Sequence, residues 1–153
     1  EPSHHTTYMY AYSGEHYKIA DKVRYINNEL YTDKPDGLSG NEDCGQMSAW
    51  YILSSMGFYP VNPSNGAYVF GSPLFDEVVL DIPGQKQFKI SAKNNSDKNI
   101  YIQSVSLNGE EHKYSYITHK EILKGGELEF TMGPKPNKDF GKEKKYRPES
   151  IVY

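Results

Sequence analysis

The spacing of apolar residues changes near residue 60, and this change limits the folds that the chain can adopt. Before that point the apolar residues repeat at intervals of four, three and four, which is one face of a helix. The clearest set is Ile19, Val23, Ile26 and Leu30. This pattern predicts helices over residues 4–12, 18–31 and about 45–56. Gly14 and Gly57 are suited to end the first and the last of these helices.

After residue 60 apolar and polar residues alternate, as they do in a half-buried strand. The strands that this alternation predicts span residues 78–80, 88–92, 100–107 and 128–132. Asn108-Gly109 signals a hairpin turn after the third strand. We therefore predict an α+β fold, with terminal helices over residues 1–60 and an antiparallel β-sandwich-like module over residues 61–153. The segment after Gly133 is rich in Pro and Lys, and we expect it on the surface.

Composition and charge argue against a nucleic-acid partner, an internal disulfide framework, a membrane-spanning helix and a signal peptide. The 153 residues carry a formal net charge of −3 and no long basic run, so we expect no nucleic-acid partner. A single cysteine, Cys44, excludes an internal disulfide framework. No apolar run approaches the roughly 20 residues that a membrane-spanning helix needs. Residues 1–12 lack the charged leader and apolar stretch of a signal peptide, so we expect the chain to begin inside a structured part of a longer protein.

The loop before the third predicted helix holds the densest group of polar side chains. They are Asp33, Asp36, Asn41, Glu42, Asp43 and Gln46. Oxygen ligands at this density could form a calcium loop, although their spacing is not that of an EF-hand. A carboxylate at the mouth of a helix could instead activate a water molecule. In a third interpretation, which the spacing alone favours, Asp43 caps the helix and Gln46 completes a capping box.

Two other groups of residues are weaker candidates for a site. His4 and His5 are adjacent, so on a helix their side chains diverge and do not easily bind one metal ion. The helix face that contains Trp50, Ile52, Leu53 and Met56 is predicted to belong to the core. Neither group indicates a function without further information.

A resemblance to a known family covers nearly the whole chain, in order. Its most specific part is GLSGNEDCGQMSAWY followed by GFYPV, within residues 37–61. Further matching strings are EPSHH at 1–5, GSPLF at 71–75, IYIQSVSLNG at 100–109, THKEILKGGEL at 118–128 and MGPKPN at 132–137. These strings resemble the C-terminal part of glycoside hydrolase family 92, whose members are calcium-dependent, inverting exo-α-mannosidases.

The resemblance implies a fold and a pair of catalytic residues. Residues 1–60 would be the last helices of an (α/α)6 barrel that holds the active site, with the β-rich module packed against them. Inversion needs one carboxyl group as acid and one as base. The family's base matches Asp43, and Asn41 stands where many relatives have a second Asp. Asp43 and Asn41 are therefore the predicted catalytic residues, and the general acid has no counterpart in this chain.

The resemblance also implies ligands, partners and a location. Glu1 would bind calcium, His5 and Glu42 would bind substrate, and Trp50 either packs in the core or contacts sugar. We expect the parent enzyme to remove terminal α-linked mannose, in α-1,2 linkage, from glycans with calcium as cofactor. Its partners would be mannose-containing glycans and the rest of its own polypeptide, in the periplasm or outside a bacterial cell. The alternative is a carbohydrate-binding or purely structural β module without a catalytic role.

Overall fold

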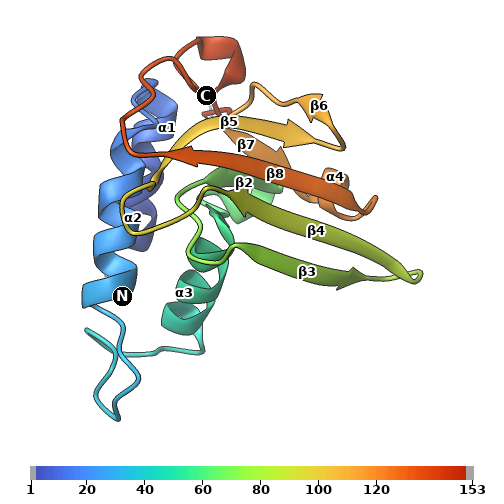
Figure 1. Ribbon diagram of the computed structural model, residues 1–153. Coiled ribbons are helices and arrows are strands. Elements are labelled where there is room, and N and C mark those ends of the chain that lie inside the picture. The colour runs from blue at the N-terminus through green and yellow to red at the C-terminus, as the bar shows by residue number, and fades with distance from the viewer. Residues whose placement is uncertain (1–2, 151–153) are drawn as a thin grey trace.

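Helices occupy the first part of the chain in the computed structural model, which describes residues 3–150 (Figure 1). They are the 3-10 helix η1 (His4–Met9), α1 (Tyr10–Ser13), α2 (Lys18–Glu29) and α3 (Gln46–Met56). The predicted helices are confirmed, and the first begins as a 3-10 helix. Gly14 and Gly57 end α1 and α3 in left-handed conformations, with φ of 82° and 106°. No helix within the described range has the length and apolar character to cross a membrane.

Side chains from these helices form a core cluster of their own. It consists of Tyr8, Ala11, Ile19, Val23, Trp50 and Val69. Trp50 is 0% exposed, and its ring stacks on Tyr31 with 5.8 Å between centroids. The predicted core role of Trp50 is therefore confirmed, whereas Ile52 is wrongly assigned because it is 52% exposed. Tyr8 donates a hydrogen bond to the Ser54 hydroxyl at 2.7 Å, which joins η1 to α3.

Two sheets lie beside the helices (Figure 1). The larger sheet has the strand order β3-β4-β8-β5-β6, and the smaller has the order β1-β2-β7. The strands are β1 (Phe58–Tyr59), β2 (Ala67–Phe70), β3 (Glu77–Ile82), β4 (Lys86–Lys93), β5 (Tyr101–Leu107), β6 (Glu110–Glu111), β7 (Tyr116–Thr118) and β8 (Gly126–Gly133). The four predicted strands are confirmed in β3, β4, β5 and β8. Asn108 and Gly109, both left-handed, form the predicted turn between β5 and β6.

The expectation of a purely antiparallel module is wrong at one pair of strands. β8 inserts between β4 and β5, and it runs parallel to β4 and antiparallel to β5. A parallel neighbour needs a long connection, and the segment from β5 to the short helix α4 (His119–Ile122) supplies it. Because β8 has partners on both sides, its inward residues Leu128 and Phe130 are fully buried.

The two sheets share a second core cluster. The Phe70 ring of β2 meets the Phe130 ring of β8 edge to face, with 5.1 Å between centroids. Phe58 of β1 belongs to the same cluster, and Leu53 of α3 packs against it. The mixed helix-and-sheet class is confirmed by this arrangement. The (α/α)6 barrel and the division at residue 60 stay predictions.

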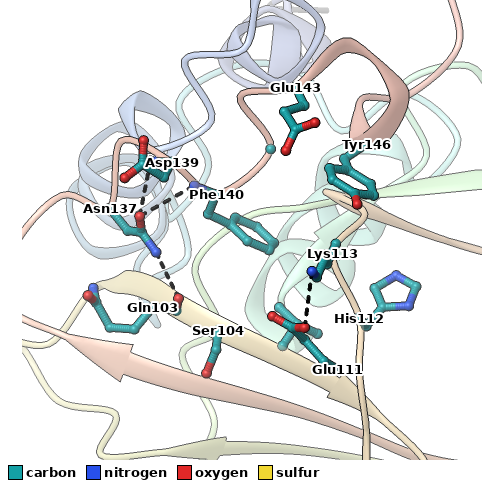
Figure 2. Close-up of a pocket in the computed structure, with 12 residues that line it drawn as sticks. Gln103, Ser104, Glu111, His112, Lys113, Asn137, Asp139, Phe140, Glu143 and Tyr146 are labelled. Carbon is teal, nitrogen blue, oxygen red and sulfur yellow. Dashed lines mark hydrogen bonds and ion pairs between the residues drawn. The ribbon is translucent and has the colours of Figure 1, made fainter.

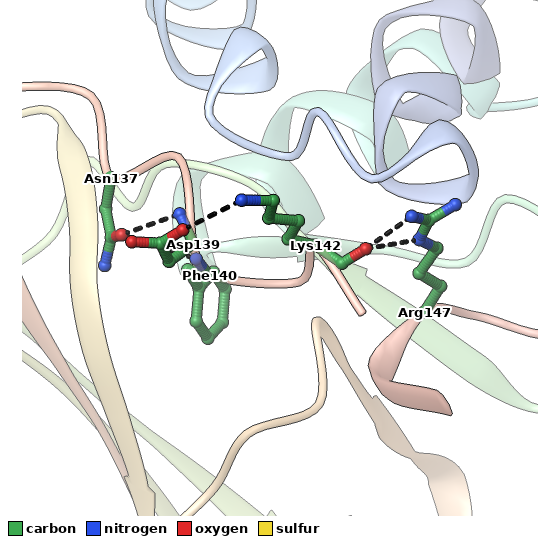
Figure 3. A network of polar contacts seen from close by, with 5 residues as sticks. All are labelled: Asn137, Asp139, Phe140, Lys142 and Arg147. Carbon is green, nitrogen blue, oxygen red and sulfur yellow. Dashed lines mark hydrogen bonds and ion pairs between the residues drawn. The ribbon is translucent and has the colours of Figure 1, made fainter. Parts of the chain in front are cut away.

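The segment after β8 is mostly exposed, as predicted, but part of it enters the core. Asn137 anchors it, because its amide nitrogen donates to the Gln103 carbonyl at 2.8 Å. The Asn137 oxygen accepts from two backbone N–H groups further along, at 3.1 and 3.3 Å (Figure 3). Phe140 then packs edge-on against His16, with 4.9 Å between the rings. The C-terminal segment therefore ties the sheet to the helices.

Candidate functional site

The loop before α3 meets the start of η1 at a pocket of about 560 Å³. The residues that line it are Ser3, His4, His5, Asp43, Gln46, Tyr59, Pro60, Val61 and Pro63. Two predicted site residues, His5 and Asp43, therefore lie on one pocket although they are far apart in the sequence. We call this hollow the active-site pocket, because it is the candidate for the active site.

A pair of hydrogen bonds holds η1 against α3 beside this pocket. The amide nitrogen of Gln46 lies 3.0 Å from Nδ1 of His4, and the Trp50 indole N–H donates to the His4 carbonyl at 3.2 Å. His4 is only 8% exposed, and burial lowers its pKa. A neutral imidazole can accept the proton of the Gln46 amide at Nδ1. These contacts fix the start of η1 and so place His5 at the pocket.

The interpretation of Asp43 as the cap of α3 is wrong. The N-cap is Gly45, which has no side chain to form a capping bond. Asp43, Cys44 and Gly45 are all left-handed, with φ of 30°, 59° and 82°. This run replaces the extended backbone that a capping residue usually adopts just before a helix. Asp43 is instead exposed on the pocket, and its carboxylate accepts no hydrogen bond from residues 3–150.

Glu42, and not Asp43, accepts hydrogen bonds from the first turn of α3. Its two carboxylate oxygens accept hydrogen bonds from the Ser48 backbone N–H at 3.1 Å and the Ser48 hydroxyl at 3.0 Å. Ser48 lies in the first turn of α3, where backbone N–H groups have no partner within the helix. Burial, and then the negative charge of Glu42, raises the pKa of Tyr31 to about 12. Glu42 does not line the active-site pocket, so its role in binding substrate stays a prediction.

The remaining predicted site residues are not brought to the pocket. Asn41 is exposed and is absent from the lining, and Glu1 lies outside the described residues. Over residues 3–150 no group of three or more His, Cys, Asp or Glu side chains could hold a metal ion. Calcium takes six to eight oxygen ligands. Calcium also takes amide and backbone oxygens, so the calcium loop and the role of Glu1 stay predictions.

One wall of the active-site pocket was not anticipated from the sequence. It is formed by the turn that follows β1, from Tyr59 to Pro63. The Tyr59 ring stacks on Tyr8 of η1 with 5.5 Å between centroids, which brings the turn back to the first helix. The string GFYPV contains these residues, but neither its spacing nor its composition shows where the turn packs.

A second, smaller pocket lies between β5 and the C-terminal segment (Figure 2). It has a volume of about 220 Å³ and shares no residue with the active-site pocket. Several of its polar groups are already engaged: Glu111 pairs with Lys113 at 3.3 Å, and the Asn137 amide donates to the Gln103 carbonyl. It also contains none of the predicted site residues, so the pocket at Asp43 is the better candidate active site.

Comparison with known sequences places the chain in a family. The family model described as glycosyl hydrolase family 92 catalytic domain matches residues 1–134. A relative from Arthroderma benhamiae, named an uncharacterized secreted glycosidase, is 32% identical over 136 residues. That match covers 87% of this chain and 18% of the relative.

Two solved structures from Bacteroides thetaiotaomicron are similar over almost the whole chain. A family GH92 α-mannosidase in complex with mannoimidazole has a TM-score of 0.93 and 40% identity, over 99% of this chain and 20% of that one. A family GH92 inverting mannosidase has a TM-score of 0.91 and 41% identity, over 98% of this chain and 20% of that one. The chain thus spans about a fifth of the length of these relatives. On this evidence the chain belongs to glycosyl hydrolase family 92, and residues 1–134 match the catalytic domain of that family.

Proposed function

We propose that the enzyme that carries this chain hydrolyses terminal α-linked mannose from glycans with inversion, and that Asp43 is its general base. The observation that carries the proposal is the position of the Asp43 carboxylate. It lines a pocket with His5 and accepts no hydrogen bond from residues 3–150, whereas the carboxylate of Glu42 is engaged by Ser48. The similarity to an α-mannosidase and to an inverting mannosidase supports the choice of reaction.

The chemistry assigns Asp43 a defined part of the reaction. In an inverting glycosidase one carboxylate takes a proton from water while a second carboxyl group protonates the leaving oxygen. The two groups stand roughly 6.5–9.5 Å apart so that water fits between them and the sugar. Asp43 is the one carboxylate among the described residues that line the pocket. The acid therefore comes from outside residues 3–150, in keeping with the expected partnership with the rest of the polypeptide.

Asn41 stays a predicted catalytic residue with a narrower role. An amide can donate to or accept from a water molecule, but it cannot take up the proton that the water loses. Asn41 is exposed in the same loop as Asp43. We propose that it helps to orient the attacking water while Asp43 alone acts as the base.

Calcium and location belong to the same proposal. We propose that the enzyme binds calcium with Glu1 among its ligands. We propose that its other ligands come from outside residues 3–150, because within that range no group of three His, Cys, Asp or Glu side chains could hold a metal ion. Bound calcium would polarise and orient sugar hydroxyl groups. We also propose α-1,2 linkage specificity and a periplasmic or secreted location, which the name of the secreted relative supports.

The configuration of the first product tests the proposed function. The complete enzyme is mixed with 4-nitrophenyl α-mannopyranoside in calcium-containing buffer, and the anomeric protons are followed by NMR during the first minutes. Inversion predicts that β-mannose appears first and that α-mannose accumulates only by mutarotation. Release of α-mannose first would contradict the inverting mechanism, and the absence of hydrolysis would contradict the substrate class.

A further inference from the structure

A second hollow adjoins the active-site pocket. It has a volume of about 590 Å³ and shares Pro60 and Pro63 with the active-site pocket. The remaining wall includes Tyr68 of β2 and His119 of α4. Because the same two prolines line both hollows, a chain-like ligand can extend from one to the other across them. We call this second hollow the outer pocket.

An aromatic pair is held rigidly in the outer pocket. The rings of Tyr68 and His119 stack at an angle of 25° with 6.1 Å between centroids, and the Tyr68 hydroxyl lies 3.3 Å from Nδ1 of His119. On its other side the Tyr68 ring packs edge-on against buried Phe58 at 5.3 Å. The His119 backbone N–H donates to the Gly66 carbonyl at 2.7 Å. His119 nevertheless remains exposed, so an ordered polar ring faces solvent beside the proposed active site.

The ridge between the two pockets is also fixed. A 3-10 turn, Pro63–Asn65, begins at Asn62, whose side-chain oxygen accepts from the Ser64 N–H at 3.2 Å and from the Ser64 hydroxyl at 2.7 Å. The proline rings of Pro60 and Pro63 restrict the backbone further. A surface that is ordered before binding loses little conformational freedom when a ligand arrives.

We propose that the outer pocket binds the sugar units that follow the terminal mannose of a glycan. This inference rests on the proposed function, because it places the terminal mannose in the active-site pocket. A pyranose ring offers an apolar C–H face and a rim of hydroxyl groups, which suits aromatic rings that carry polar atoms, such as Tyr68 and His119. Binding of these remote sugars supplies energy that can be used in the transition state.

Substrates of different length test the outer pocket in the complete enzyme. His119→Ala is expected to lower kcat/KM for a linear α-1,2-mannotriose about tenfold, the loss of one aromatic contact. The same change should leave hydrolysis of 4-nitrophenyl α-mannopyranoside unaltered, because that substrate has no sugar behind its mannose. Tyr68→Phe keeps the ring and should retain most of the activity on mannotriose. Lys124→Ala, an exposed change outside the pocket, is the matched control.

If His119→Ala lowers kcat/KM equally on both substrates, or does not lower it on mannotriose, the proposed role of the outer pocket is wrong. If the wild-type enzyme does not hydrolyse mannotriose, calorimetric titration with the same sugar decides the question. Binding that His119→Ala weakens about tenfold supports the pocket, whereas absent or unchanged binding rejects it. Failure to hydrolyse the aryl mannoside as well would reject the proposed function separately.

Discussion

Glu42 and Asp43 are adjacent carboxylates with different partners. Glu42 uses both oxygens to bond Ser48, whereas Asp43 lines the active-site pocket. The left-handed backbone at Asp43 and Cys44 produces the difference, because the chain turns between Glu42 and the start of α3. A general base must lie within reach of the water that it activates. Of the two residues, Asp43 is the one that lines the active-site pocket.

Removing the Glu42 carboxylate should weaken the first turn of α3. We expect Glu42→Ala to lower the free energy of unfolding by about 1 kcal/mol, the usual cost of losing a helix-capping acceptor. Because Glu42 and Ser48 share the interaction, the effect of Ser48→Ala should be smaller in the Glu42→Ala background than in the wild type. Urea unfolding of the four proteins measures this coupling. Strictly additive effects would show that the contact between the Ser48 hydroxyl and Glu42 contributes nothing.

At the scale of elements, α3 is fixed by what lies at each end. Its start is held by the Glu42–Ser48 contact, and its end is closed by Gly57 with φ of 106°. The Gly57 carbonyl accepts from the Gly71 N–H at 2.8 Å, so the helix end is joined to the segment after β2. This packing sets where β1 and its following turn return to the active-site pocket.

Gly57 and Gly84 both have left-handed backbones, so an alanine substitution at each distinguishes the cost of a packing clash from the cost of the backbone conformation. A side chain at Gly57 would place Cβ 3.1 Å from both Pro73 and Phe130, whereas at Gly84, with φ of 87°, nothing lies within 4 Å. We expect Gly84→Ala to cost about 1 kcal/mol for the left-handed conformation alone. Gly57→Ala should cost roughly 1–3 kcal/mol more, because the core must move. Equal shifts in the urea midpoint for Gly57→Ala and Gly84→Ala would show that the contacts with Pro73 and Phe130 add no cost.

The elements that depend on local spacing could be predicted, and those that depend on distant partners could not. The repeat of Ile19 and Val23 was enough for α2, and alternation was enough for β8. The parallel pairing of β8 with β4 is set by strands far apart in the sequence. The capping pattern at Asp43 failed because it assumes an extended entry to the helix, and the chain enters through left-handed residues. The meeting of His5 with Asp43 was suggested by the family resemblance alone.

At the scale of the molecule, both halves of the chain border the proposed substrate path. The active-site pocket joins η1, the loop before α3 and the turn after β1, and the outer pocket continues it along β2 and α4. The C-terminal segment stabilises this arrangement through Phe140, which packs on His16 of the helical part. Nε2 of His16 lies 2.9 Å from the Phe70 carbonyl of β2. His16 is therefore a buried link between the helices, a sheet and the C-terminal segment.

This link should make stability depend on pH. Burial lowers the pKa of His16 to about 4, below the unfolded value near 6.5. As pH falls, the unfolded chain binds the proton first, so the contribution of neutral His16 is complete above pH 6.5 and is lost toward about pH 4. Thermal unfolding between pH 7 and 5 should show a smaller decline for His16→Gln than for the wild type. Exposed His119→Gln serves as the control, and an unchanged slope in His16→Gln would contradict the assignment.

The most direct test of the account is the turnover of Asp43→Asn in the complete enzyme. The amide keeps the size of the side chain but cannot accept a proton from water, so kcat for 4-nitrophenyl α-mannopyranoside should fall about 10³-fold. Asp36→Asn, which removes an exposed carboxylate outside the pocket, should keep wild-type turnover, and both variants should unfold at the wild-type temperature. Wild-type turnover in Asp43→Asn would show that another group activates the water.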